Sequence, residues 1–150
     1  MIRDEIKAAT IAAMKSGDKE TTGTLRLVQA AVKNRDIELR TGGGPASDDQ
    51  LVTEVLQKMV KQRRESAEIY RKGSREDRAA AEEREIAVIE RFLPAQMSDS
   101  EAEEKIRELI AESGATTMKD MGRIMALVKE RLGASIEPAR ASRLVKAALG

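Results

Sequence analysis

Apolar residues recur at intervals of three and four along most of the chain, and this spacing predicts amphipathic α-helices. In the N-terminal part the apolar positions fall into four segments. They are Ile2, Ile6, Ala9 and Ala13; then Leu25, Val28, Ala31, Val32 and Leu39; then Leu51, Val55, Met59 and Ile69; then Ile86, Ile89 and Leu93. Strand-like alternation is not found. The N-terminal part is therefore predicted to contain about four helices.

Residues typical of helix ends separate these segments. Gly17 ends the first helix and Asp18 caps the second, which stops before the loop at Thr41–Pro45. A capping box of Ser47 with Gln50 begins the third helix, and Gly73-Ser74 ends it. Ser74 with Asp77 is then predicted to begin the fourth.

Three shorter helices are predicted after Pro94. The first is predicted to begin at a capping box of Ser98 with Glu101, the second at Thr117 and the third at Pro138. Their apolar stripes are Ile106, Leu109 and Ile110; Met121, Ile124, Met125 and Val128; and Leu144, Val145 and Leu149. Because proline restricts the residue before it, the chain is expected to divide near 94–97. The predicted domains are 1–96 and 97–150.

The composition excludes several classes of chemistry. Cysteine and histidine are both absent, which excludes disulfides, thiolate zinc sites and a histidine general base. We therefore expect no cofactor and no metal. No apolar run is long enough to span a bilayer, so we expect no membrane association and a cytoplasmic location.

Nucleic-acid contact would have to be local, because the net charge is only +1. One Tyr and one Phe leave few rings on which bases could stack. These rings, Tyr70 and Phe92, are expected to pack between helices, and Met118, Met121 and Met125 to fill gaps in the core. No sequence-specific DNA binding is expected.

Three stretches of sequence together resemble a known family. They are Thr24-Leu25-Arg26-Leu27-Val28-Gln29-Ala30-Ala31-Val32-Lys33-Asn34, Lys61-Gln62-Arg63-Arg64-Glu65-Ser66, and Phe92-Leu93-Pro94 with Met118-Lys119-Asp120-Met121-Gly122. The chain is similar to YqeY-like proteins of the GatB/YqeY family. The resemblance implies an all-α fold whose C-terminal three-helix domain is similar to the tail of the tRNA amidotransferase B subunit, which helps to hold tRNA. It implies none of that enzyme's catalytic cores.

Basic residues of the C-terminal part form the preferred candidate RNA-binding surface. They are Arg123, Lys129, Arg131, Arg140, Arg143 and Lys146. Arg140, Arg143 and Lys146 follow one another at three-residue steps. Cations near helix ends also complement the helix dipole, which is the structural alternative.

A possible second basic surface lies on the third predicted helix, at Lys58, Lys61, Arg63, Arg64 and Arg71. The alternative is a solvated face on which Lys61 and Arg64 form ion pairs with Glu65 and Glu68. Metal ligation or acid/base chemistry is one interpretation of the acidic clusters at Glu82, Glu83 and Glu85, and at Glu101, Glu103 and Glu104. Negative charge in a helix N-terminal turn explains Glu101 and Glu104 better.

Three functional hypotheses follow. The first is a non-catalytic accessory module that binds tRNA or another structured RNA through phosphates and 2′-hydroxyls. The second is a helical adaptor that binds a protein partner. The third, a component of a carbon-nitrogen ligase that uses glutamine as amide donor, lacks a nucleophile and a base that could be placed in the sequence.

Overall fold

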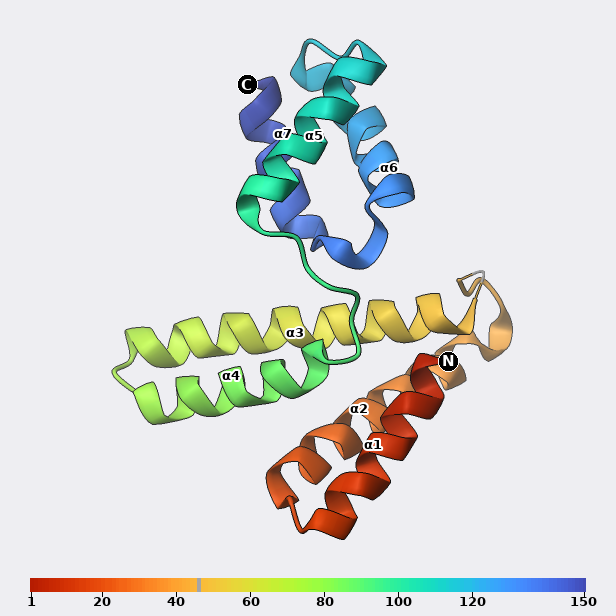
Figure 1. The fold of residues 1–150 in the computed structure, drawn as a ribbon, viewed down its shortest axis with the longest axis vertical. Helices are drawn as coiled ribbons and strands as arrows, with labels where there is room; N and C mark the ends of the chain where they lie inside the picture. The colour runs from red at the N-terminus through yellow and green to blue at the C-terminus, as the bar shows by residue number, and fades with distance from the viewer. Residues whose placement is uncertain (46) are drawn as a thin grey trace. The chain divides into compact units, whose positions relative to one another are not determined.

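The computed structural model describes residues 1–45 and 47–150, with the backbone alone at residue 134. In these residues every regular element is helical, as predicted (Figure 1). The contacts divide the chain into two compact units, Met1–Leu93 and Pro94–Gly150. Each unit has a hydrophobic core of its own.

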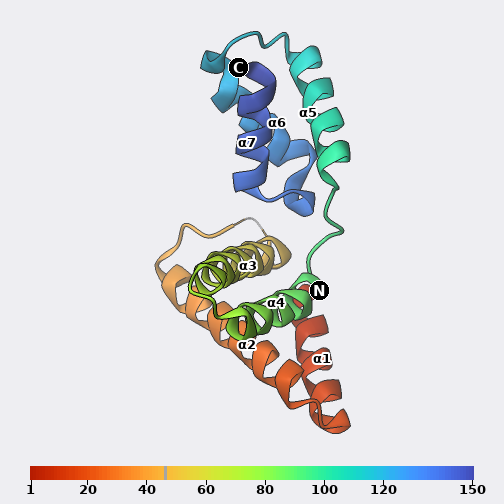
Figure 2. The same ribbon diagram turned by 90° about the vertical axis from the view of Figure 1, so that its left-hand side faces the viewer.

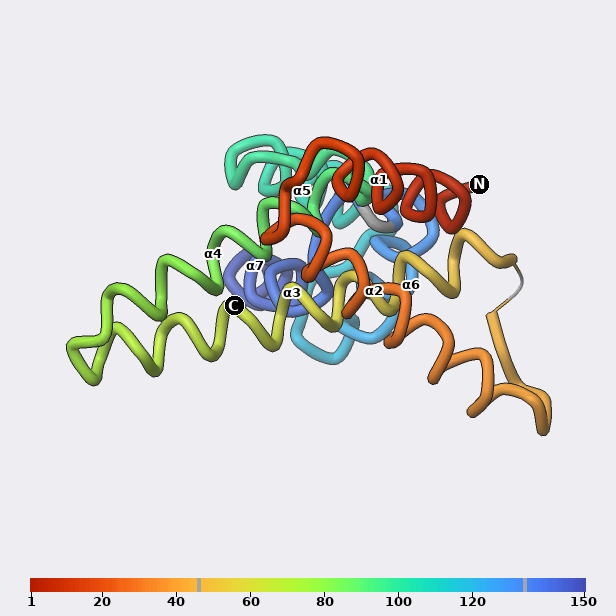
Figure 3. Tube along the Cα trace, turned by 90° about the horizontal axis from the view of Figure 1, so that it is seen from below, coloured from red at the N-terminus to blue at the C-terminus, as the bar shows by residue number. Residues whose placement is uncertain are grey.

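Unit Met1–Leu93 contains two helical hairpins. Helices α1 (Ile2–Ser16) and α2 (Lys19–Glu38) form the first, and a 3-10 turn, η1 (Leu39–Thr41), follows α2. Helices α3 (Asp48–Lys72) and α4 (Glu76–Glu90) form the second and lie side by side (Figure 3). Their shared core includes Ile6, Leu25, Val28, Leu56 and Ile89.

Unit Pro94–Gly150 is a bundle of three helices (Figure 2). They are α5 (Asp99–Ser113), α6 (Met121–Arg131) and α7 (Pro138–Leu149). The 3-10 turn η2 (Met118–Asp120) precedes α6, and η3 (Gly133–Ser135) precedes α7. Ile106, Ile124, Ile136 and Val145 are almost completely buried at the centre.

Most of the predicted helix ends are confirmed. Gly17 ends α1 in the left-handed conformation, and the Asp18 side chain accepts a hydrogen bond from the Thr21 N–H. Ser47 caps α3 by accepting from the Gln50 N–H, and Ser98 caps α5 in the same way. The Gln50 side chain donates to Glu54, so it does not contribute the second half of a capping box.

The prediction that Ser74 caps α4 is wrong. Its φ is +58°, whereas a capping side chain requires an extended backbone. Ser74 instead belongs to the end of α3: its N–H donates to the Arg71 carbonyl, and the Arg75 N–H donates to the Tyr70 carbonyl. These two bonds make a Schellman motif.

Two apolar residues expected in the core are exposed. Ile69 was assigned to the apolar stripe of α3 but is 69% exposed, and Met118 is 43% exposed in η2. Met59 of the predicted stripe is buried, and Leu51 and Val55 are partly buried against the core. The other buried residues of α3 are Val52, Leu56, Val60 and Ala67. Helix α4 packs against α3, and the exposed Ile69 does not belong to the core that they share.

Candidate nucleic-acid interface

Helix α7 carries two exposed cations for which the described residues provide no counter-ion. Arg143 and Lys146 lie three residues apart, whereas Ala141 and Val145 on the other side of the helix are buried. The helix contains no acidic residue. Among the described residues neither Arg143 nor Lys146 forms an ion pair, so both charges are available to an anionic ligand.

Arg140, at the start of α7, is bound within the unit. One Nη donates to Asp99 Oδ1 over 3.3 Å and the other donates to the Met97 carbonyl. Its side chain is only 24% exposed, and its Nε is buried without a partner among the described residues. Arg140 thus connects α7 to the first residue of α5 and to the segment before it, and little of its charge faces solvent.

Two further predicted residues line the groove between α5 and α6. Arg123 donates to the Ser113 carbonyl and to Asp120, each over 3.1 Å, and Arg131 forms an ion pair with Glu112. The pKa of Asp120 lies below its usual range. The Asp120 carboxylate accepts hydrogen bonds from the backbone N–H groups of Thr116 and Thr117, and the nearby Arg123 adds to the shift. These two arginines are therefore partly neutralised by their neighbours.

Lys129 lies on a different side of α6 from Arg123. Six residues separate them, which turns the helix through about 600° and places their side chains about 120° apart. Lys129 is exposed and forms no ion pair among the described residues. In the part of the chain that the structure describes, three of the six predicted residues, Lys129, Arg143 and Lys146, have no counter-ion, and the other three bind within the unit.

The second basic surface proves to be largely a set of contacts between α3 and α4. Arg63 donates to Glu85 over 3.2 Å and to the Met59 carbonyl, and its side chain is only 14% exposed. Arg64 bonds Glu90 over 2.8 Å. Lys58 and Lys61 are exposed and, in the described part of the chain, form no ion pair.

Two residues of the acidic cluster of α4, Glu83 and Glu85, form ion pairs with arginines of α3. Arg71 pairs with both Glu76 and Glu83, over 2.9 and 2.7 Å. Along α3 itself, Glu68 forms an ion pair with Lys72 over 3.5 Å. Partial burial raises the pKa of Glu82, and the neighbouring carboxylate of Glu85 adds to this shift.

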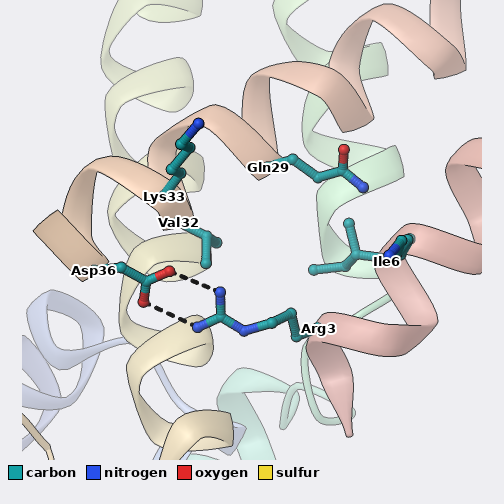
Figure 4. Close-up of a pocket in the computed structure, with 7 residues that line it drawn as sticks. Arg3, Ile6, Gln29, Val32, Lys33 and Asp36 are labelled. Carbon is teal, nitrogen blue, oxygen red and sulfur yellow. Dashed lines mark hydrogen bonds and ion pairs between the residues drawn. The ribbon is translucent and has the colours of Figure 1, made fainter.

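A cationic cleft of 320 Å³ between α1 and α2 was not predicted from the sequence. Its lining includes Arg3, Lys7, Gln29 and Lys33 (Figure 4). Arg3 is held by Asp36 over 2.8 Å and by Asp48 over 2.7 Å, whereas both lysines are exposed. The available signal was that Gln29 and Lys33 belong to the first stretch of the family resemblance.

These features describe a helical protein with two small units, each of which exposes cations at a helix surface. No helix among residues 1–45 and 47–150 is long and apolar enough to cross a membrane.

Comparison with known proteins supports the family resemblance. The family model "Yqey-like protein" matches residues 3–149, and the chain therefore belongs to the YqeY-like family. It is 31% identical over 138 residues to "Altered inheritance of mitochondria protein 41, mitochondrial" of Clavispora lusitaniae, covering 89% of this chain and 75% of that protein.

A protein of the same name from Vanderwaltozyma polyspora is 28% identical over 126 residues. That alignment covers 80% of this chain but 64% of the yeast protein, so the chain spans less than two thirds of this relative. An "Uncharacterized protein" of Schizosaccharomyces pombe is 30% identical over 94 residues, which is 63% of this chain and 73% of that protein.

Proposed function

We propose that unit Pro94–Gly150 is a non-catalytic module that binds the phosphate backbone of a structured RNA such as tRNA. The observation that carries this proposal is the outer face of α7, where Arg143 and Lys146 are exposed on a helix without acidic residues. Lys129 is a third cation available to the same kind of ligand. The resemblance to the tail of the amidotransferase B subunit adds a reason to choose tRNA.

The composition of this unit favours contact with the backbone rather than with bases. The two aromatic residues, Tyr70 and Phe92, both belong to the other unit. Without rings for stacking, affinity would come from release of counter-ions by lysine and arginine. Two or three phosphate contacts give a slope of log affinity against log salt of about −2 to −3. Such weak binding suits an accessory module.

Binding of total tRNA across a salt series tests this proposal. The variant Arg143→Glu/Lys146→Glu should lose about tenfold or more of the affinity at low salt, because like charges then face the phosphates. Arg140 is left intact, since reversing it would set a carboxylate against Asp99 and the Met97 carbonyl. The readout is fluorescence anisotropy with labelled tRNA.

Lys58→Glu/Lys61→Glu is the matched control, because it makes the same charge change on α3. It should bind tRNA as the unaltered protein does. Loss of binding in this control alone would move the RNA site to α3. If the unaltered protein binds no tRNA at low salt, the RNA proposal fails.

The other functional hypotheses remain secondary proposals. A protein-binding adaptor is favoured by exposed apolar side chains on α1, at Ile11 and Met14. A component of a carbon-nitrogen ligase that uses glutamine is implied by the family resemblance only. A cytoplasmic location likewise remains a prediction, since the names of the relatives from Clavispora and Vanderwaltozyma place those proteins in mitochondria.

A further inference from the structure

Helices α1 and α2 lie antiparallel in a register that is fixed by contacts along their length. Three pairs of side chains define it: Arg3 with Asp36, Thr10 with Gln29, and Met14 with Arg26. The two residue numbers in each pair add up to 39 or 40. The same register places Lys7 of α1 at the level of Lys33 of α2.

Lys7 and Lys33 line one cleft, and neither lysine forms an ion pair with the described residues. The apolar side chains of Ile6 and Val32 contribute to the lining. The nearby Asp36 carboxylate accepts two hydrogen bonds from Arg3, over 2.8 and 3.0 Å, while the Lys33 side chain extends away from that pair (Figure 4). Because Arg3 engages the Asp36 carboxylate, an anionic group of a ligand would find both lysine charges available.

Exposed apolar side chains continue from this cleft toward the other end of the hairpin. Ile11 is 47% exposed and Met14 is 53% exposed, one and two turns beyond Lys7. The guanidinium of Arg26 lies 3.7 Å from the Met14 sulfur and, in the described part of the chain, forms no ion pair. We call Lys7, Ile11, Met14, Arg26 and Lys33 the α1–α2 patch.

We infer that the α1–α2 patch binds an acidic amphipathic helix of a partner protein. The patch places cations at two levels. Lys7 and Lys33 form the first level, and Arg26, seven residues from Lys33 along α2, forms the second. Seven residues of helix span about 10 Å. A partner helix that lies along the groove would place two carboxylates seven residues apart against these cations. Its apolar residues three and four positions after the first carboxylate would contact Ile11 and Met14.

Charge complementarity and apolar area together favour a helix over RNA on this patch. A phosphate backbone would satisfy the three cations but would leave Ile11 and Met14 without an apolar contact. An amphipathic helix presents carboxylates and apolar side chains on one face at the required spacing. This inference does not rest on RNA binding, which was assigned to α7 in the other unit.

A synthetic helical peptide tests the inference with the full-length chain. The peptide carries two glutamates seven residues apart and leucines three and four residues after the first glutamate. We expect saturable binding by fluorescence anisotropy, and amide shifts in α1 and α2 by NMR. Lys7→Glu/Lys33→Glu should weaken this binding at least tenfold, and so should Ile11→Ser/Met14→Ser.

Two matched controls make the result decisive. Lys58→Glu/Lys61→Glu carries the same charge change on α3 and should bind the peptide normally, as should Arg143→Glu/Lys146→Glu on α7. A peptide of the same composition in scrambled order should bind at least tenfold more weakly. Circular dichroism of each variant excludes loss of the fold as the cause of weaker binding.

Three results would overturn the inference. They are the absence of saturable binding of the designed peptide, equal loss of binding in the α3 control, and tRNA binding that is lost in Lys7→Glu/Lys33→Glu. The last result would assign the patch to RNA. Because the RNA proposal is tested on α7, its failure leaves this experiment unaffected.

Discussion

Ser74 ends α3 in a backbone conformation that usually belongs to glycine. Its φ of +58° lies in the left-handed region, where a Cβ approaches the following carbonyl oxygen. The adjacent Gly73 has a φ of −89° and does not use its conformational freedom. The hydrogen bonds of Ser74 and Arg75 to Arg71 and Tyr70 hold the turn nevertheless. The position therefore carries strain that glycine would relieve.

Ser74→Gly is expected to increase the free energy of unfolding by about 0.5–1 kcal/mol. The gain from relieving the left-handed strain exceeds the entropy that glycine adds to the unfolded chain. Urea unfolding followed by circular dichroism measures the change. Ser74→Ala keeps a Cβ and should stay within about 0.5 kcal/mol of the unaltered protein. Destabilisation by glycine would show that the serine hydroxyl matters more than the backbone strain.

At the scale of elements, ion pairs join α3 and α4 in addition to their apolar contacts. Arg63 is the most buried of the arginines concerned, and it bonds both Glu85 and the Met59 carbonyl. The pKa of Glu82, close to Arg63 in the same contact, is raised by burial and by Glu85. Loss of Arg63 would leave two partly buried carboxylates without their cation. This arginine therefore serves the hairpin itself rather than an external ligand.

Arg63→Met should lower the free energy of unfolding by about 2 kcal/mol, because charged hydrogen-bonded groups are left without a partner. Lys61→Met, two residues earlier on the solvent side of α3, should change it by less than about 0.5 kcal/mol. Adding Glu85→Gln to Arg63→Met should restore part of the loss, since it removes the unpaired charge. If Arg63→Met is as stable as the unaltered protein, the favourable energy of the ion pair between Arg63 and Glu85 only offsets the cost of desolvating the two charges.

On the scale of the whole molecule, the two units have separate cores. Leu25, Leu56 and Ile89 belong to one, whereas Ile106 and Ile124 belong to the other. A three-helix unit of this size buries a small apolar surface, so its stability as a fragment is modest. Its helix caps and its hydrophobic core nevertheless lie within the unit itself.

Residues 94–150 expressed alone are therefore expected to fold. Circular dichroism should show a helical spectrum and a cooperative thermal transition. The complementary fragment 1–93 should do the same, because its two hairpins share one core. An unfolded C-terminal fragment would mean that its helices depend on contacts with residues 1–93.

Helix ends were the features that the sequence predicted best, because their signals are local. The side chain of Asp18 bonds a backbone group three residues away, and Pro138 suits the first turn of α7 whatever packs around it. Ser74 shows the limit of such signals. A serine after a glycine can begin one helix or end another, and only its backbone conformation distinguishes the two.

The sequence by itself determined the helical class, most helix ends and the presence of basic residues on α3, α6 and α7. The tertiary structure decided which side of each helix is buried and which charges are paired. Ile69 and Met118 are exposed because packing partners, rather than apolarity, select the buried face. Likewise Arg140 meets Asp99 across 41 residues and Arg3 meets Asp48 across 45, so no local pattern could identify these pairs. Availability of a charge depends on neighbours that are distant in sequence, and only the fold brings them together.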